Sequence, residues 1–290
     1  MLVTRFIMRK ILLMLSGVVL VPLTGTSASA TELKPETAAA FDQYIHATEA
    51  HMQDAVSQGR FLFLDDLPKS RCVQSYQQVQ RGGIYVQALH SLEDNHSIRI
   101  PSGLIHHWVA VVFIRNATLT QAVDVLQDYE HHKDFYKPML RDSKLIDRNG
   151  NNFKIFLQFS NTAGATVVLN AEFNVTATRF SDTQYQLALH STRIAELANP
   201  GKPDEHELPV GDDRGFMWRL NTYWRIEEKD GGVYIQNESV ELSRTVPAII
   251  AWFVNPFIKS IPRGILVNLL SVTRKAVIKE AISAKPLASQ

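Results

Sequence analysis

Two adjacent histidine pairs are the residues that most directly suggest metal chemistry in this sequence. They are His106-His107 and His131-His132. Neighbouring residues on a strand point to opposite faces, and neighbouring residues on a helix diverge by about 100°, so neither pair can hold one ion as a unit. The HExxH spacing, which brings two histidines onto one helix face, is absent. We therefore predict no metal site and no cofactor.

Little in the sequence supports catalysis by a cysteine or serine nucleophile either. Cys72 is the only cysteine, so the chain cannot form an internal disulfide or a multi-thiolate zinc site. The GxSxG motif of a serine nucleophile is absent. Glu241, together with Arg193 or His107, is the remaining candidate for acid–base work, because burial can tune a carboxylate for proton transfer. Structural ion pairs perturb carboxylates just as well, so we leave catalysis open and favour a protein that is not an enzyme.

Glu241 belongs to a segment that predicts a hairpin. Residues 217–242 read MWRLNTYWRIEEKDGGVYIQNESVEL, with alternating runs on both sides of Asp230-Gly231, a two-residue turn signal. With that turn, Trp224 pairs with Asn237, and Leu220 pairs with Glu241. One face then carries Trp218, Leu220, Thr222, Trp224, Ile226, Ile235, Asn237, Ser239 and Glu241. The opposite face, with Arg219, Asn221, Tyr223, Arg225, Glu227, Gln236 and Glu238, is predicted to be an exterior ladder of polar residues.

The first of these faces is unusual for the interior of a sheet. Asn237, Ser239 and Glu241 would point inward, and a buried polar group without a partner costs about 1–3 kcal/mol. The pattern indicates a cavity that holds water or a ligand. The alternative is that these side chains lie near an open rim or bond one another. In QYQLALHSTRI, alternation places Arg193 on the apolar side of its strand, where it can pair with Glu241.

The order of the elements predicts how these residues are positioned. A helix runs from Thr37 to about Gly59, and a buried strand, HHWVAVVFIRN, starts at His106. One or two helices follow in ATLTQAVDVLQDYEHHKDFYKP, and then come the strands FKIFLQF, ATVVLNAEFNVTATRF and QYQLALHSTRI. A segment rich in Pro, Gly and charge leads to the hairpin, and IPRGILVNLLSVTRKAVIKEAIS predicts a final helix with Ile265, Leu269, Val272 and Ala276 on one side. A sheet with one apolar face and one amphipathic helix is expected to wrap that helix.

This order resembles the START-like (SRPBCC) helix-grip superfamily, which includes lipid-transfer and polyketide cyclase/dehydrase proteins. The resemblance covers about residues 97–283, and the phrases QDYEHHKDFYKPM and GFMWRLNTYWRIEEKDGGVYIQNESVELSR look like a bacterial exported branch. It implies an α+β fold in which a curved antiparallel sheet of six to seven strands wraps a long C-terminal helix, with a cavity between them. The superfamily has no universal catalytic motif, so the resemblance supports the fold more than the function.

The first thirty residues predict an export signal. Arg9 and Lys10 precede the apolar run ILLMLSGVVLVPL, and Ala28-Ser29-Ala30 has the small residues of a cleavage site. We expect cleavage after Ala30 and a periplasmic or secreted bacterial protein, with retention as an anchor as the alternative. Cleavage removes Arg5, Arg9 and Lys10 and no acid, so the formal charge changes from +1 to −2, which excludes a general basic footprint for nucleic acid. The predicted domains are 1–30 (signal), 31–96 (N-terminal helical extension), 97–285 (ligand-binding domain) and 286–290 (tail).

Residues 245–262, TVPAIIAWFVNPFIKSIP, form the most apolar stretch after the signal. The stretch is too short to span a bilayer. It packs beneath the final helix in one interpretation. In the other, Trp252, Phe253 and Phe257 form an apolar lip at the cavity mouth that contacts a membrane or a ligand, because exposed apolar patches mark interaction sites.

The functional expectation is the binding, and in one version the transport, of a hydrophobic small molecule or lipid in the cavity. The alternatives are a cyclase/dehydratase-like or hydrolase-like enzyme using the same cavity, and a non-catalytic interaction module whose cavity is filled by its own side chains. The predicted ligand-binding residues are Leu169, Phe173, Arg193, Trp218, Thr222, Trp224, Asn237, Ser239, Glu241, Ile265 and Leu269.

Overall fold

The computed structural model describes residues 33–90, 92–93, 96–161, 166–209, 213–244 and 248–283, and of residues 92–93, 96–97 and 248–262 it describes the backbone alone. Residues 31–290 form one compact unit by their internal contacts. The predicted signal (1–30) and tail (286–290) lie outside the described residues. No helix among the described residues is long and apolar enough to cross a membrane.

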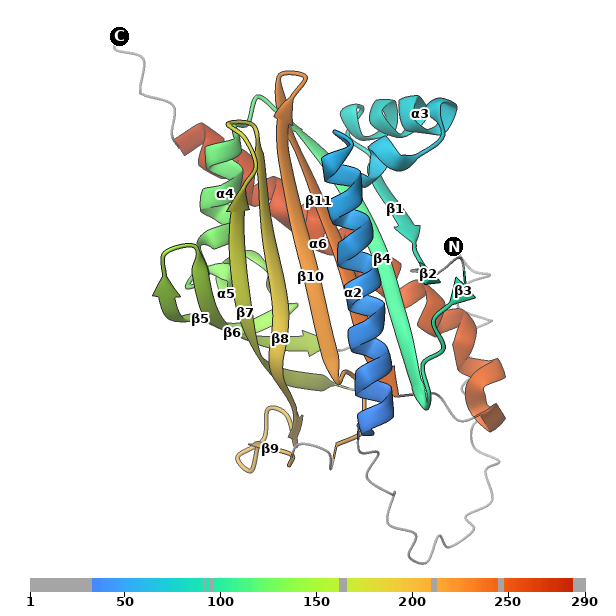
Figure 1. Cartoon of the computed structure of the whole chain (residues 1–290). Coiled ribbons are helices and arrows are strands. Elements are labelled where there is room, and N and C mark those ends of the chain that lie inside the picture. The colour runs from blue at the N-terminus through green and yellow to red at the C-terminus, as the bar shows by residue number, and fades with distance from the viewer. Residues whose placement is uncertain are drawn as a thin grey trace, which may run out of the picture. The chain divides into compact units, whose positions relative to one another are not determined.

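One antiparallel sheet organises this unit (Figure 1). Its strand order is β1-β4-β11-β10-β8-β7-β6-β5, and β9 pairs with β8 at one end. A separate small sheet pairs β2 (Leu92–Glu93) with β3 (His96–Ser97). The strands of the main sheet are β1 (Ile84–Ala88), β4 (Gly103–Arg115), β5 (Leu140–Asn149), β6 (Asn152–Asn161), β7 (Val167–Arg179), β8 (Gln184–Ala198), β9 (His206–Glu207), β10 (Arg219–Lys229) and β11 (Gly232–Arg244).

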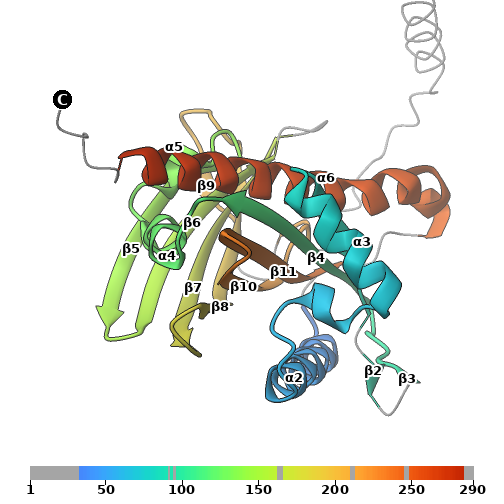
Figure 2. The same ribbon diagram turned by 90° about the horizontal axis from the view of Figure 1, so that it is seen from above.

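The C-terminal helix α6 (Ala248–Ser283) lies across one face of this sheet, the inner face, together with α4 (Leu119–Gln127) and α5 (His132–Phe135) (Figure 2). Buried side chains of α6 join those of the strands in the main core, which includes Ile155, Phe173 and Ile235. This is the predicted α+β helix-grip arrangement, and the prediction is confirmed. The sheet has more strands than the six to seven expected, because β1 and β9 also pair with it.

The details of α6 differ from the sequence prediction. The helix begins at Ala248 rather than at Ile261, so the apolar stretch before Pro262 continues the same helix. Its inward side chains are Leu266, Leu270, Thr273 and Val277, which are all buried. Ile265 is 45% exposed, so its predicted inward position is wrong, and Leu269 packs at the edge of the core. The inward line is offset by one residue, which rotates it by about 100° on a helix.

The opposite, outer face of the sheet is also covered. The helix α2 (Pro35–Ser57) lies along it, followed by the 3-10 turn η2 (Phe63–Asp66) and the helix α3 (Lys69–Gln80) (Figures 1 and 2). Phe41, Tyr44 and Ile45 of α2 pack against Val240 and Leu242 of β11. The predicted N-terminal extension therefore covers the sheet, and its last part supplies the strand β1.

These elements cover the face of the hairpin that was predicted to be exterior, so that prediction is wrong. On this face, Tyr223, Arg225 and Gln236 are 2%, 4% and 0% exposed, respectively. Alternation separates the two faces of a strand, but it does not show whether a polar face meets water or a second layer with matching polar groups.

Candidate functional site

The register of the β10–β11 hairpin matches the prediction, since Trp224 pairs with Asn237 and Leu220 pairs with Glu241. The next strand, β4, extends the same rows, with Ala110 opposite Asn237 and His106 opposite Glu241. Side chains paired across a sheet share a face. The inner face therefore carries a group of polar residues that we call the polar strip: His106, Thr222, Asn237, Ser239 and Glu241.

The inner face is filled unevenly along these strands. Near the hairpin turn, Ile226, Val233 and Ile235 are each 0% exposed. Towards the other end, Leu220 and Ser239 are only half-buried. Closely packed interiors leave few voids larger than a water molecule. The drop in burial therefore means that the described side chains fill the space between the sheet and α6 at the end near the hairpin turn and not at the other end.

Asn237 lies at the boundary between these two parts and is 1% exposed. Its Nδ2 donates a hydrogen bond to Thr222 Oγ1 at 2.8 Å. Its Oδ1 is buried and has no hydrogen-bond partner among the residues that the structure describes. Such an orphaned acceptor costs about 1–3 kcal/mol, and this is the cost expected of a group kept for a ligand or a bound water.

Glu241 is the acidic member of the polar strip. It is half-buried by area, yet its surroundings desolvate the carboxylate and raise its pKa to about 7. Among the described residues it has no hydrogen bond or ion pair. His106, opposite it, lies 3.3 Å from Ser243 Oγ through Nε2, and burial lowers the pKa of its imidazole, so His106 is neutral at pH 7.

Arg193 does not join the polar strip, and its predicted place on the apolar side of β8 is wrong. Phe173 pairs with Ser191, while the preceding residue Glu172 pairs with Arg193, so Thr192 is an extra residue in β8. This β-bulge reverses the alternation beyond it. Arg193 consequently lies on the outer side and forms an ion pair with Glu207 of β9, so it cannot pair with Glu241.

Trp218 is also misplaced by the prediction. It precedes the first residue of β10, where strict alternation no longer applies. Its ring packs with Phe41 and Ile45 of α2 on the outer side. Its Nε1 is buried, and no described residue accepts a hydrogen bond from it.

The other predicted ligand-binding residues lie in or beside the main core. Leu169, Phe173 and Trp224 are buried in it, and Leu269 borders it, while Ile265 faces outward. The sequence prediction omitted His106 and Trp108. Both could have been found, because they alternate with Ala110 in β4 and therefore share its face. The side chains of Trp252, Phe253 and Phe257 lie outside the described residues.

His107 is on the outer face, so its suggested pairing with Glu241 is wrong as well. Its Nε2 lies 2.8 Å from Glu238 Oε1, and its Nδ1 lies 3.0 Å from the hydroxyl of Tyr44 in α2. Arg225 donates to the backbone oxygens of Phe61 and Met52 at 2.9 and 3.2 Å. These buried bonds explain how α2 and η2 cover polar side chains without leaving them unpaired.

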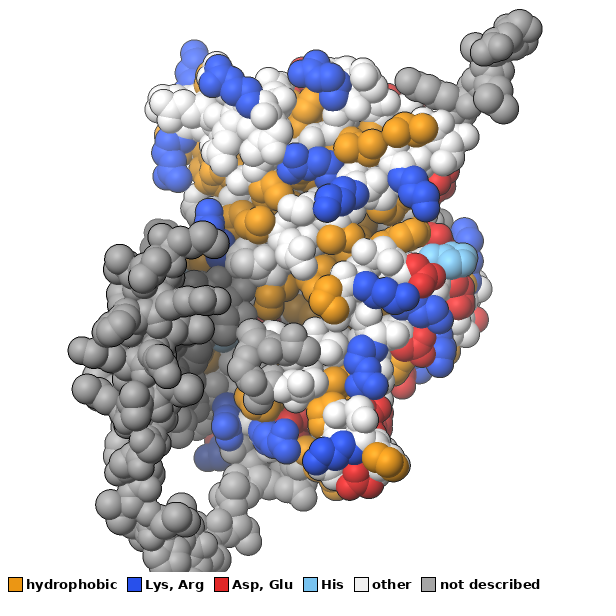
Figure 3. Space-filling view, turned by 180° about the vertical axis from the view of Figure 1, so that it is seen from behind, with side chains coloured by type: hydrophobic (Ala, Val, Ile, Leu, Met, Phe, Trp, Pro, Cys, Tyr) orange, Lys and Arg blue, Asp and Glu red, His pale blue; other side chains and the backbone are white. Residues whose placement is uncertain are grey.

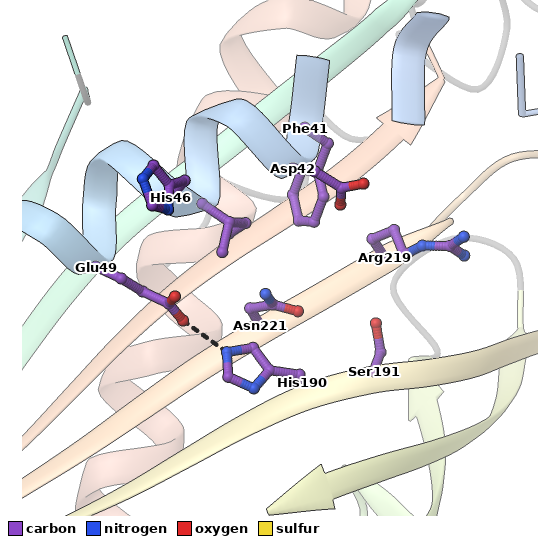
Figure 4. Close-up of a pocket in the computed structure, with 9 residues that line it drawn as sticks. Phe41, Asp42, His46, Glu49, His190, Ser191, Arg219 and Asn221 are labelled. Carbon is purple, nitrogen blue, oxygen red and sulfur yellow. Dashed lines mark hydrogen bonds and ion pairs between the residues drawn. The ribbon is translucent and has the colours of Figure 1, made fainter. Parts of the chain in front are cut away.

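A second feature of the outer face is a pocket of about 370 Å³ between α2, β8 and β10 (Figure 4). Glu49 Oε1 lies 2.7 Å from His190 Nε2 and accepts a hydrogen bond from the Tyr223 hydroxyl at 2.8 Å. The His190 bond is the main cause that lowers the pKa of Glu49. These contacts join the helix to the sheet. The lining residues are Phe41, Asp42, Ile45, His46, Glu49, His190, Ser191, Arg219 and Asn221.

The remaining histidine pair has ordinary surroundings. His131 Nδ1 lies 2.7 Å from Asp128 Oδ1 on an exposed turn. His132 is buried, and desolvation lowers its pKa to about 4, so it is a neutral core residue. Over the described ranges, no group of three or more potential metal ligands comes together.

Comparison with known proteins gave similarity to solved structures alone. No protein-family model and no curated protein sequence matches the chain. A STAR-related lipid transfer protein from Xanthomonas axonopodis is 15% identical, with 66% of this chain and 98% of that chain covered and a TM-score of 0.42. Human STARD10 is 12% identical, with 73% and 81% covered and a TM-score of 0.42. The Zhui aromatase/cyclase from Streptomyces sp. R1128 is 11% identical, with 64% and 99% covered and a TM-score of 0.42.

The first two of these structures are START-related proteins, and the third is an aromatase/cyclase. Similarity at this level says nothing about which ligand the chain binds, because one fold hosts many functions. The fold assignment rests on the strand order and on the position of α6.

Proposed function

We propose that this protein binds a hydrophobic small molecule or lipid between the inner face of the sheet and α6. The apolar body of the ligand would lie against Trp224 and Trp108, beside Leu220 and Leu269. Its polar group would reach the polar strip. Ligand sites of this kind are mostly apolar, with a few placed polar groups that fix orientation.

The observation that carries this proposal is the buried, unpartnered Oδ1 of Asn237 beside the half-buried end of the inner face. A polar group that costs free energy in the empty protein gains it back when a ligand supplies the missing hydrogen bond. The space-filling view of the α6 side supports the apolar part, since apolar side chains gather near the middle of that face with Lys and Arg around them (Figure 3).

A second candidate function is an enzyme that uses the same site for proton transfer. The observation in its favour is the pKa of Glu241, raised to about 7, where a carboxylate can both accept and release a proton. Glu241→Gln separates the two functions. It would abolish turnover of a co-purifying compound by an enzyme, and it would change only the affinity or orientation of the ligand in a carrier.

The proposed binding is tested by organic extraction and mass spectrometry of the protein purified from its native compartment. We expect a recurring hydrophobic compound in near-stoichiometric amount. Ser239→Trp, which places a large ring at the half-buried end of the inner face, should remove most of it. Asn174→Trp on the exposed outer side of β7 adds the same ring elsewhere and should leave the amount unchanged. Equal yields from both variants would exclude the inner face as the site.

Two further expectations from the sequence stay proposals. The protein is exported and cleaved after Ala30, which N-terminal sequencing of the mature protein from the periplasm or medium would test. Trp252, Phe253 and Phe257 contact a membrane during ligand exchange, which vesicle sedimentation with and without their replacement by Ser would test.

A further inference from the structure

The charges on the inner face restrict the head group that the proposed site can accept, and this inference rests on the proposed function. The strands β4, β10 and β11 carry the polar strip. Their inward-facing residues include two acids, Glu228 and Glu241, and no Lys or Arg. Glu228 Oε2 already accepts a hydrogen bond from the backbone N–H of Leu119 at the start of α4, at 2.6 Å. Glu241 is therefore the available charge.

The arginines near these strands are held elsewhere. Arg219 and Arg225 alternate onto the outer face, under α2. The bulge turns Arg193 outward to Glu207. Arg214 donates through its backbone N–H and its Nη1 to Glu196, at 3.1 and 2.8 Å. Anionic head groups are usually held by Arg or Lys. Three of these guanidinium groups lie on the outer side of the sheet, and that of Arg214 is paired with Glu196.

The groups that remain in the polar strip are mainly acceptors. Asn237 Oδ1 accepts no hydrogen bond from the described part of the chain, and the Glu241 carboxylate accepts hydrogen bonds when it is ionised. The hydroxyls of Thr222 and Ser239 can either donate or accept. His106 adds no positive charge, because burial keeps its imidazole neutral at pH 7.

We propose that the ligand of this site carries a hydrogen-bond-donating head, a hydroxyl or a protonated amine, and that the site rejects carboxylate and phosphate heads. A donor head satisfies Asn237 Oδ1 and Glu241 together. An anionic head would place a second negative charge beside Glu241, and the inward-facing residues of β4, β10 and β11 include no cation to offset it. Like charges in a poorly solvated site repel strongly.

The test compares three ligands with one chain length: 1-dodecanol, dodecylamine and dodecanoate. Each is titrated at a concentration where it is dissolved as a monomer, below the solubility limit or the micelle concentration, into the full chain at pH 8.5, where the Glu241 carboxylate is ionised. Binding is followed by the fluorescence of Trp108 and Trp224, which border the site. We expect the alcohol and the amine to bind at least about tenfold more tightly than the acid, a difference of about 1.4 kcal/mol.

Glu241→Gln tests the cause of this selectivity. Gln has the same shape without the charge, so the acid should gain about tenfold in affinity and the amine should lose a similar factor. Glu228→Gln is the matched control, because its Oε still accepts from Leu119 and the residue lies at the closed end of the inner face. It should leave the order of affinities unchanged. Circular dichroism checks that both variants fold.

The outcomes separate the head-group inference from the proposed function. Tighter binding of dodecanoate, or equal affinity for all three ligands with no response to Glu241→Gln, would overturn the inference and leave hydrophobic binding intact. No binding of any of the three, by fluorescence and by native mass spectrometry, would overturn both.

Discussion

At the scale of single residues, Glu241 determines much of what the inner face can do. Its carboxylate combines a desolvated position with the lack of a partner among the described residues, and its pKa is raised from 4.5 to about 7. The sequence located it correctly, because the Asp230-Gly231 turn fixes the hairpin register locally. Its environment was not predictable from the hairpin alone, because the neighbouring strand β4, which places His106 opposite Glu241, comes from a distant part of the chain.

The raised pKa of Glu241 predicts a pH dependence of stability. Between pH 4.5 and 7 the folded protein holds a proton that the unfolded chain has released, so the free energy of unfolding falls as pH rises through this window. The full loss is about 3 kcal/mol, since the pKa rises by about 2.5 units and each unit corresponds to about 1.4 kcal/mol. Urea unfolding at pH 5 and pH 8 measures it. Glu241→Gln should remove this contribution, and an unchanged pH profile in that variant would assign it to other groups.

Two histidines of the outer face should differ sharply in their contribution to stability. His107 is buried, and its replacement by Ala leaves the Glu238 carboxylate buried without its partner, at a cost of about 3 kcal/mol. His190 and Glu49 are each 40% exposed in their side chains, so His190→Ala should cost less than about 1 kcal/mol. Urea denaturation of the two variants compares them directly. Equal losses would mean that the His107–Glu238 pair is not desolvated.

At the scale of elements, features that depend on contacts between residues close in the chain were predictable, and features that depend on contacts between distant residues were not. Thr118 caps α4, and its Oγ1 accepts from the backbone N–H of Gln121, which is a local contact of the kind that a sequence can predict. The bulge at Thr192 adds one residue without any distinct composition, so alternation carried through it gave the wrong face for Arg193. The cover by α2 was not predictable from the strands, because it joins residues more than a hundred positions apart, such as Glu49 and Tyr223.

The bulge in β8 leads to a prediction about Arg193. Because Arg193 lies outside with Glu207, Arg193→Ala should change the free energy of unfolding by less than about 1 kcal/mol and leave ligand binding unaffected. Asn237→Ala, on the inner face, should change the amount of bound compound. Extraction yields from the two variants, with unfolding curves as the check on folding, measure both effects. A loss of ligand in Arg193→Ala would mean that β8 lacks the bulge.

At the scale of the whole unit, both faces of the sheet are covered, but by different kinds of contact. The outer face is held by hydrogen bonds and ion pairs between α2, η2 and the strands, which fix the cover in one position. The inner face joins an apolar core at one end to a polar strip with unused acceptors at the other. A rigid outer layer would keep the strands in register while a ligand enters on the side of α6.

The most direct test of this account maps where a ligand lies. A long-chain alcohol with a photoreactive diazirine in its chain is bound to the protein, irradiated, and located by peptide mass spectrometry. We predict labelling of peptides from β4, β10, β11 and the part of α6 around Leu269, with competition by unlabelled alcohol. Labelling confined to α2 and the pocket beside His190, or labelling that unlabelled alcohol does not reduce, would contradict a ligand site on the inner face.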